Sequence, residues 1–590
     1  MLLRLSFRYV CLSLLLIIAL PLAFAQSQKP VVRRDSSEQS ALQQGQEALK
    51  SGDMARARTE FERAVRLVPT DPAAQAALGW MLAQQGEPDE ALKHLHVALR
   101  LMPSFANARL TLVNVLTQLG KLQEAEQEAR TAVKMTPENA EAHRILARTL
   151  SRQNSDEALK QMRRAVELAP LRADLQDDLG NLLAQQRNFT DAEVSFQKAL
   201  RLQPSLEPAH FHLGVLRFEQ GKLDAAAGEL QTAVQLVAGD AAAHYYLAKT
   251  LKAQLKDVEA REQFRQAASL NPRWFEAQVE FGLASQRAGD ADDAVTAFTA
   301  ATKLRPQDPD AFNDLGLALI QKGDAESAVS EFQAATQLRP EDGTLRGNLA
   351  IAYMQHADFD SAITELQTAL KLAPENASLH YNLGLAYKLK DQLDKAVPEF
   401  ENAIRLQPDL SDAHYTLGVL YWQKGDFDKA AGELHRAIQG QPNYAEAHYT
   451  LGTVLKQQGK LAESAAELRE AIRLQPDFAG AHTTLAAVLR QLGDTQGAAS
   501  EAREGARIAA ITNSTQAATF ATNSGKRLLS VGDVQGAISQ FRSAINSQPN
   551  YAAAHYQLGL ALQQNGQKEE AKGEFQKAAE LDPHLAEPAR

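Results

Sequence analysis

A proline recurs at a near-constant interval of 34 residues along almost the whole chain. The series has fourteen members, namely Pro69, Pro103, Pro137, Pro170, Pro204, Pro272, Pro306, Pro340, Pro374, Pro408, Pro442, Pro476, Pro549 and Pro583. Ala238 and Ala510 stand at two further positions of the same period. A fixed period in the thirties predicts a solenoid of stacked supersecondary units, in which each unit contacts only its neighbours. Length alone would suggest roughly four domains of about 150 residues, but the periodicity predicts one elongated array.

The period divides the chain into sixteen repeats and a few short segments. Repeats 1 to 14 cover residues 38–512, with one residue missing in repeat 4, and repeats 15 and 16 cover residues 518–585. The other segments are an N-terminal stretch (1–25), a polar linker that we expect to be disordered (26–37), an insert (513–517) and a tail (586–590). The repeats therefore leave little room for an enzyme domain.

The N-terminal stretch has the pattern of a secretory signal peptide. Arg4 and Arg8 supply the positive end, residues 10–20 form an apolar core, and Ala23 and Ala25 form a small-x-small cleavage site before Gln26. This pattern predicts an exported protein, periplasmic or secreted, with no stable membrane insertion after cleavage. The alternative is an uncleaved anchor, for which the apolar run is short compared with the about 20 residues of a bilayer span.

Cleavage would also remove the only cysteine, Cys11, and the charges of Arg4 and Arg8, so that the net charge changes from -10 to -12. A chain without thiols gains no disulfide in an oxidising compartment, and its stability must come from packing. A solenoid that follows nucleic-acid phosphates needs a basic stripe. The acidic balance therefore predicts no nucleic-acid partner and no anionic membrane surface as partner.

The spacing inside residues 411–444 predicts a helical hairpin. Gly425 interrupts the helical pattern with a left-handed C-cap, Asp428 is placed to cap a second helix, and Pro442 ends that helix. The apolar face of the first helix is formed by His414, Leu417, Gly418 and Tyr421, and that of the second by Phe427, Ala430, Leu434, Ala437 and Ile438.

Three slots, numbered by position within the repeat, are small in nearly every repeat. Slot 8 is Gly in eleven repeats, Ala in four and Val113 in one. Slot 20 is Ala except at Ser464, and slot 27 is Ala except at Gly505. Glycine inside a helix costs roughly 0.5–1 kcal/mol relative to alanine, so its recurrence predicts close approach of the two helices. We expect slot 27 to meet the first helix of the following repeat.

These recurring residues make the chain resemble the tetratricopeptide repeat (TPR) family, whose pattern has an aromatic residue, Leu-Gly, Tyr, Ala, Phe, Ala and Pro at fixed offsets. The resemblance covers about nine-tenths of the chain. It implies an all-α, right-handed superhelical solenoid of about sixteen TPR helical hairpins, whose first helices line a concave groove for protein or peptide ligands. Slot 4, where the family often has Trp, instead carries histidine eight times, at His143, His210, His244, His380, His414, His448, His482 and His555.

The recurrence of histidine at one slot favours a packing role over metal binding. Zinc sites on one helix need ligands three or four residues apart together with a third ligand, and no such set occurs here. No phosphate-binding loop or nucleophile elbow departs from the repeat background. We therefore expect no catalytic residues, no metal and no cofactor, and the chain is predicted not to be an enzyme.

By the TPR resemblance, slots 5, 9, 12 and 13 of the first helices face the groove. In repeats 11 to 14 the candidate ligand residues are Tyr381, Lys388, Tyr415, Trp422, Tyr449, Lys456 and Arg490. A second candidate cluster consists of Phe211, Phe218, Tyr245, Lys249 and Lys252. Aromatic rings give contact area at low entropic cost, and neighbouring cations suit acidic or carboxylate-bearing peptides. The alternative is that Tyr at slot 5 is a packing residue of the family, independent of any ligand.

The prediction for function is a non-enzymatic protein–protein interaction scaffold of the bacterial cell envelope. The alternatives are a periplasmic adaptor of a polysaccharide or protein export machine, or a substrate-presenting partner of a separate glycosyltransferase. The last resembles the TPR arm of O-linked N-acetylglucosamine transferases, but their recurrent slot-6 Asn is found here only at Asn348, Asn382 and Asn523. Self-association stays open.

Three deviations coincide at the end of repeat 14: Gly505 replaces alanine, Ala510 replaces proline, and residues 513–517 are inserted. Without the proline, the second helix of repeat 14 can continue past its usual end. We therefore expect the regular stacking to be interrupted between repeats 14 and 15.

Overall fold

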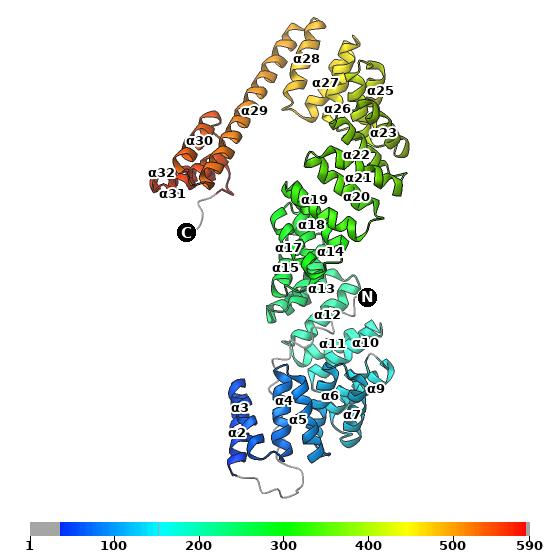
Figure 1. The fold of residues 1–590 in the computed structure, drawn as a ribbon, viewed down its shortest axis with the longest axis vertical. Coiled ribbons are helices and arrows are strands. Elements are labelled where there is room, and N and C mark those ends of the chain that lie inside the picture. Colours follow the sequence, from blue (N-terminus) through cyan, green and yellow to red (C-terminus); the bar gives the residue numbers. More distant parts are fainter. Residues whose placement is uncertain (1–35, 152, 586–590) are drawn as a thin grey trace. The chain divides into compact units, whose positions relative to one another are not determined.

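The computed structural model describes residues 36–151 and 153–585, which form 31 helices and no strand. The described chain divides between residues 306 and 307 into two compact bodies, of which the described residues are 36–306 without residue 152, and 307–585. In each body consecutive helices pack in pairs, and each pair packs against the next (Figure 1). The prediction of an all-α solenoid of helical hairpins is confirmed. The predicted signal peptide, nearly all of the linker and the tail lie outside the described residues.

The hairpins share one geometry, as in repeat 2, where a first helix of 13 residues is followed by a second of 14 residues. The first helices are α2 (Ser36–Lys50), α4 (Pro72–Gln84), α6 (Ala106–Gln118), α8 (Ala140–Leu150), α10 (Ala173–Gln185), α12 (Glu207–Glu219), α14 (Ala241–Ala253), α16 (Phe275–Arg287), α18 (Pro309–Lys322), α20 (Gly343–Gln355), α22 (Ala377–Leu389), α24 (Ser411–Gln423), α26 (Ala445–Gln457), α28 (Ala479–Gln491) and α31 (Ala552–Gln564). The second helices are α3 (Met54–Leu67), α5 (Pro88–Leu101), α7 (Leu122–Met135), α9 (Ser155–Leu168), α11 (Phe189–Leu202), α13 (Leu223–Leu236), α15 (Asp257–Leu270), α17 (Ala291–Leu304), α19 (Ala325–Leu338), α21 (Phe359–Leu372), α23 (Leu393–Leu406), α25 (Phe427–Gly440), α27 (Leu461–Leu474), α30 (Val534–Ser547) and α32 (Lys568–Leu581). One longer helix, α29 (Thr495–Ser530), contributes to two repeats.

The turn inside a repeat is set by a glycine followed by an N-cap, as repeat 12 illustrates. Gly425 has a φ of 80°, the left-handed conformation expected of it. The N-cap of α25 is Asp426, whose Oδ1 accepts a hydrogen bond of 3.2 Å from the backbone N–H of Lys429. The prediction that Asp428 is the cap is wrong, because Asp428 lies within the first turn of α25. There its negative charge still favours the helix N-terminus.

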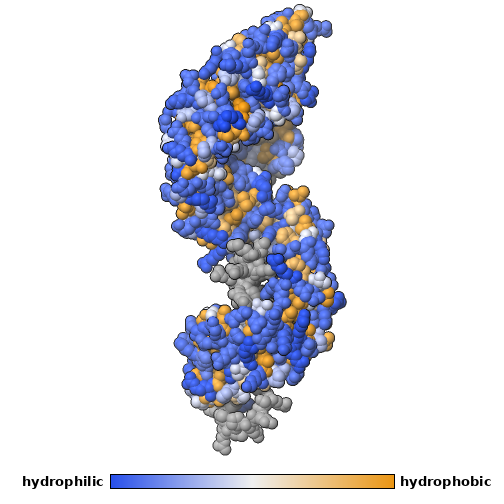
Figure 2. All heavy atoms as spheres, turned by 90° about the vertical axis from the view of Figure 1, so that its right-hand side faces the viewer, coloured by the Kyte–Doolittle hydropathy of each residue, from blue (hydrophilic) through white to orange (hydrophobic). Residues whose placement is uncertain are grey.

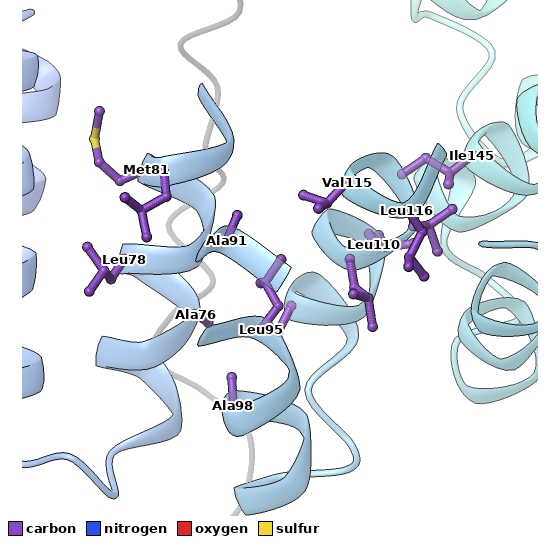
Figure 3. Packing of buried hydrophobic residues seen from close by; sticks show 14 of the residues in the cluster. Ala76, Leu78, Met81, Ala91, Leu95, Ala98, Leu110, Val115, Leu116 and Ile145 are labelled. Atoms are coloured by element: carbon purple, nitrogen blue, oxygen red, sulfur yellow. The ribbon is translucent and has the colours of Figure 1, made fainter. Parts of the chain in front are cut away.

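Slots 8 and 24 of one repeat face each other, and repeats 2 and 3 divide the space between these two slots in opposite ways. A Cβ on Gly79 would lie 2.8 Å from Leu95 Cγ, so the glycine leaves the space that the leucine fills. Repeat 3 has the opposite arrangement, with Val113 at slot 8 and Ala129 at slot 24, both buried. Figure 3 shows Leu95 among the buried apolar side chains of α4, α5 and α6. Close packing therefore explains why small residues recur at slot 8.

Gly505 is the one glycine at slot 27, and a side chain at this position would point toward the first helix of its own repeat. A Cβ on Gly505 would lie 2.9 Å from Thr483 Oγ1 and 3.3 Å from the carbonyl oxygen of Ala479, both in α28. The prediction that slot 27 meets the following repeat is therefore wrong at this position. The tight fit of α28 against α29 explains why a small residue is needed there. At Ala544 of repeat 15, in contrast, slot 27 clusters with Ala554 of repeat 16, as predicted.

Within each body, the second helices also contact the next repeat through slots 21, 24 and 28. They pack against slots 7, 10 and 11 of the next first helix, as in the cluster of Ala431, Leu434 and Ile438 with Leu451, Val454 and Leu455. The same slots join repeat 13 to repeat 14, through Ala465, Leu468 and Ile472 with Leu485, Val488 and Leu489. Within each body, and apart from α29, the second helices thus carry an apolar face on which the next first helix lies.

Repeats 14 and 15 are joined differently, because α29 is one uninterrupted helix of 36 residues. It combines the second helix of repeat 14, residues 513–517 and the first helix of repeat 15 (Figure 1). The prediction that the second helix of repeat 14 continues past its usual end is confirmed. Ala510, at the position of the missing proline, lies within this helix and is exposed.

Candidate protein-binding surface

The slot-4 histidines form polar clips between adjacent repeats. His414 Nδ1 lies 2.6 Å from Glu433 Oε2, and Nε2–H donates to the carbonyl oxygen of Pro408 at 3.0 Å. The same clip recurs at His210 with Glu229 and Pro204, His380 with Glu399 and Pro374, His448 with Glu467 and Pro442, His482 with Glu501 and Pro476, and His555 with Glu574 and Pro549. Each clip joins a second helix to the proline that ends the preceding repeat.

Other residues replace histidine in the same clip. Arg346 donates to the carbonyl oxygen of Pro340 at 3.1 Å and to Glu365 Oε2 at 2.7 Å. His143 and His244 use a glutamine oxygen in place of the carboxylate. Because both ring nitrogens of these histidines have hydrogen-bond partners, neither is free to bind a metal ion. No group of three or more His, Cys, Asp or Glu side chains that could hold a metal occurs among the described residues.

The three slot-5 tyrosines of repeats 11 to 13 are half-buried against other rings. Tyr415 lies on Tyr444 with ring centroids 4.9 Å apart, and Tyr449 lies on Phe478 at 4.7 Å. Tyr381 packs against Phe400 at 5.7 Å. Each tyrosine therefore stabilises its own repeat and offers only part of its surface to a ligand.

Slot 12 of repeats 11 to 14 carries Lys388, Trp422, Lys456 and Arg490. Arg490 is exposed and the other three side chains are half-buried. None of the three cations forms a side-chain hydrogen bond or ion pair within the described part of the chain. Slot 14 of these repeats differs, because Lys424 donates to Asp394 Oδ1 at 3.2 Å and Lys390 pairs with Asp360. Cations without a partner therefore gather at slot 12, around one tryptophan.

The second candidate cluster lies within the first body, on α12 and α14. The ammonium group of Lys249 lies 5.2, 5.9 and 5.4 Å from the ring centroids of Phe218, Tyr245 and Tyr246. Such distances allow cation–π attraction. Lys252 is neutralised by Glu280, with Nζ 2.8 Å from Oε2. Of the two lysines predicted for this cluster, only Lys249 lacks an anionic partner within the described residues.

The remaining aromatic residues of this cluster are held by packing. Tyr245 is buried on Trp274, with centroids 4.5 Å apart, and burial raises its pKa. Phe211 contacts Tyr246 edge-on at 5.7 Å. Tyr246 is absent from the predicted set because it stands at slot 6, which the groove assignment left out.

Slot 6 supplies further contacts between neighbouring first helices that were not anticipated from the sequence. His212 Nδ1 lies 3.0 Å from Asp177 Oδ1, and Asn348 donates to Asn313 Oδ1 at 2.7 Å. Burial lowers the pKa of His212, but the neighbouring Asp177 outweighs it, and the net pKa is raised. Both contacts join slot 5 of one repeat to slot 6 of the next, 35 residues later, and this constant separation could have predicted them from the sequence.

The acidic residues Glu207 and Asp240 interact electrostatically with each other, and Glu207 also interacts with His212. Burial, followed by the charge of Asp240, raises the pKa of Glu207 to about 8. Glu207 Oε1 is also buried without a hydrogen-bond partner in the described structure. Such a carboxyl group is held protonated at neutral pH, because burial and the negative charges of Asp240 and Asp177 disfavour its ionisation.

Models of the TPR family match the chain over most of its length. The tetratricopeptide repeat models match residues 82–149, 319–386, 389–453 and 421–488, then 42–104, 149–207, 178–241 and 279–343, and finally 552–585. A TPR repeat model matches residues 525–566. The chain belongs to the tetratricopeptide repeat family. Proteins of this family generally act as protein–protein interaction scaffolds.

Solved TPR structures are similar to the chain at low identity, and none of the curated proteins matches it. The APC/C hetero-tetramer Cut9-Hcn1 is 18% identical over 71% of this chain and 97% of its own, with a TM-score of 0.35. YrrB, described as a TPR protein with an unusual peptide-binding site, is 24% identical over 31% of this chain and 94% of its own, with a TM-score of 0.29. A TPR protein from Parabacteroides merdae is 19% identical over 42% of this chain and 99% of its own, with a TM-score of 0.37. At these TM-scores the likenesses say nothing about the ligand of this chain.

The face in Figure 2 is largely hydrophilic, with small scattered apolar patches. Among the described helices, none combines the length and the apolar character needed to cross a membrane.

Proposed function

We propose that this chain is a non-enzymatic scaffold that binds protein or peptide ligands on the first-helix surface of its TPR repeats. The observation that supports this most directly is the row of slot-12 residues in repeats 11 to 14. Lys388, Lys456 and Arg490 have no ion pair among the described residues, although the slot-14 lysines nearby are paired. A cation left unpaired beside an aromatic ring is suited to an anionic group of a ligand.

The chemistry of this row favours an acidic, extended segment as ligand. Trp422 supplies a large half-buried ring between the cations, and tryptophan and arginine are enriched among residues that dominate binding energy. The signal-peptide pattern of residues 1–25 favours partners in the cell envelope. The Lys249 cluster of the first body has the same combination of rings and an unpaired cation, and we propose it as a second contact surface.

A cross-linking experiment in cells tests the proposal. A photoreactive phenylalanine analogue at position 422 should capture partner proteins that mass spectrometry identifies. The same analogue at position 469 is the control, since Arg469 is exposed on the second helix α27 of repeat 13. Capture from both positions with the same partners, or from neither, contradicts the assignment.

Charge reversal then tests which residues bind. Lys456→Glu should weaken capture of the identified partner at least about tenfold, a loss of about 1.4 kcal/mol. Arg469→Glu makes the same change of charge in the same repeat and should leave capture unchanged. Equal effects of the two substitutions would mean that only the overall charge matters and that slot 12 is not the binding surface.

A further inference from the structure

Helix α29 keeps two halves of a repeat-to-repeat contact apart. In a regular stack, the first helix of repeat 15 would lie on slots 21, 24 and 28 of repeat 14, as in the preceding repeats. Here that first helix continues in line with the second helix of repeat 14, so it cannot fold back onto it. The slots left uncovered are Ala499, Ala502 and Ala506, of which Ala499 and Ala506 are exposed.

The other half of this contact carries an unusual aromatic residue. Slot 3 is Ala or Leu in repeats 2 to 14 and 16, and every one of these side chains is at most 4% exposed. In repeat 15 slot 3 is Phe520, which is 76% exposed. A phenylalanine in place of a buried alanine does not fit the regular stack unless the facing slots become smaller.

The facing slots have become smaller. In repeat 16, slot 3 (Ala554) clusters with Ala544 and Ile545, at slots 27 and 28 of the repeat before it. The equivalent slots facing Phe520 are Gly505 and Ala506. Gly505 is already packed against α28, but Ala506 stands at slot 28 where most other repeats have Val, Leu or Ile. Volume lost from slot 28 of repeat 14 thus matches volume gained at slot 3 of repeat 15. Such matched exchange indicates that the two faces pack against each other.

Within one chain these faces cannot meet while α29 is intact. Phe520 and Ala506 are 14 residues apart on one helix, which is about 21 Å at 1.5 Å per residue. Both faces do, however, point to the same side of α29, because successive steps of three and four residues connect Ala502, Ala506, Ala509, Asn513, Gln516 and Phe520. An antiparallel second α29 would therefore place each face opposite its complement.

We infer that a second copy of this chain covers this face, with the two α29 helices antiparallel about a two-fold axis at Asn513. Asn513 is midway between residues 506 and 520, so the axis brings each Phe520 over the partner's small residues. The ring packs on the small side chains of Ala502, Ala506 and Ala509, which lie on the same face of α29. The contact is isologous, as in most homodimers.

The occupant follows from the interface that repeats throughout the chain. At the preceding junctions of the second body this face is covered by a TPR first helix that runs antiparallel to it. The first helix of repeat 15 is the one whose slot 3 matches the small slot 28 of repeat 14, and α29 carries it away from its own repeat 14. A second copy supplies it without unwinding α29. The exchange restores two junctions per dimer, in the manner of domain swapping.

Analytical ultracentrifugation of the full chain tests this inference. The wild-type protein should show a concentration-dependent dimer, and Phe520→Ala should raise the dimer Kd at least about thirtyfold, because a central aromatic anchor is lost. Ile511→Ala is the matched control: Ile511 is 45% exposed on the same helix, nine residues and half a turn away, and its loss should leave Kd unchanged.

Cysteine cross-linking locates the axis. In a Cys11→Ser background, Asn513→Cys should form a disulfide-linked dimer on oxidation, and Ile511→Cys should not. A wild-type chain that stays monomeric at all concentrations overturns the inference and favours α29 unwinding so that repeat 15 closes onto its own repeat 14. A dimer unaffected by Phe520→Ala, or linked equally well through positions 511 and 513, overturns it as well.

Discussion

The exchange of volume between slots 8 and 24 can be tested by converting one repeat into its neighbour. Repeat 2 has Gly79 facing Leu95, whereas repeat 3 has Val113 facing Ala129. We therefore consider Gly79→Val and Leu95→Ala, separately and together. The double variant reproduces the arrangement of repeat 3 within repeat 2.

Each single change should destabilise the hairpin for a different reason. Leu95 is fully buried, and Leu→Ala at such a site costs about 2–5 kcal/mol through lost contacts and a cavity. A valine at position 79 would place Cβ 2.8 Å from Leu95 Cγ and 3.2 Å from the carbonyl oxygen of Ala91. Overpacking of this kind costs about 1–3 kcal/mol. Independent effects would therefore add to about 3–8 kcal/mol.

The double variant should lose much less, because the valine methyl groups occupy the space that the leucine leaves. We expect a favourable coupling of at least about 2 kcal/mol, well above the about 0.5 kcal/mol within which independent sites add. Local opening free energies of α4 and α5 from hydrogen exchange are the suitable measurement, since a long repeat array need not unfold in two states.

A distant pair controls for additivity. Gly79→Val combined with Leu434→Ala removes the equivalent leucine from repeat 12, where no contact is shared, and the two effects should simply add. If the Gly79 and Leu95 pair also added within about 0.5 kcal/mol, the limit for independent sites, the volume exchange would be refuted. Slot 8 would then be small for another reason.

Four further outcomes are expected. Glu207→Gln should stabilise α12 by up to about 5 kcal/mol at pH 9 and not at pH 4. The raised pKa of about 8 means that the stability from the protonated carboxyl is lost as pH rises from about 4.5 through 8, and hydrogen exchange at the two pH values measures it. His414→Arg should keep the clip of repeat 12, because Arg346 makes the equivalent contacts in repeat 10. His414→Leu should instead cost about 1–3 kcal/mol of stability in denaturation experiments, because Glu433 loses a buried partner. In the monomeric chain, below the concentration at which it dimerises, limited proteolysis should cut first within residues 512–519, apart from the chain ends. Residues 512, 513, 516 and 517 are exposed there, and within the described chain the hydrogen bonds of this segment to residues outside α29 join only Ser514, Thr515 and Thr519 to Gln548 and Tyr551. First cuts elsewhere would contradict this. N-terminal sequencing of the exported protein should begin at Gln26, and a membrane-bound product that begins at Met1 would contradict the signal-peptide assignment.

The hairpins were predictable because the same contacts recur in sixteen repeats, so that chance variation at any one position is averaged out. Single positions within the period were less certain. Asp426 and Asp428 both stand near the start of α25, and both aspartates suit an N-terminal turn. Only the backbone geometry, with Gly425 in the left-handed conformation and Asp426 directly after it, decides which one is the cap.

The ring partners of the slot-5 tyrosines could have been found from a second regularity in the sequence. Tyr245 and Trp274, Tyr415 and Tyr444, and Tyr449 and Phe478 each join slot 5 of a repeat to slot 34 of the same repeat. These two slots are far apart in the period, and a search along one helix face cannot connect them. The same applies to the clips, whose His and Glu are 19 residues apart on different helices.

The sequence alone could not show that, among the described residues, the lysines of slot 12 are unpaired and those of slot 14 are paired. Lys388 and Lys390 are two residues apart in the same helix region and chemically identical, yet only Lys390 has a carboxylate partner in the structure. That partner, Asp360, stands at slot 18 of the preceding repeat, 30 residues away. Whether a cation is neutralised or left for a ligand therefore depends on the second helix of the neighbouring repeat. The residues of the first helices alone therefore do not show which cations have a carboxylate partner. The unpaired cations of slot 12 are identified only when the second helix of the neighbouring repeat is considered as well.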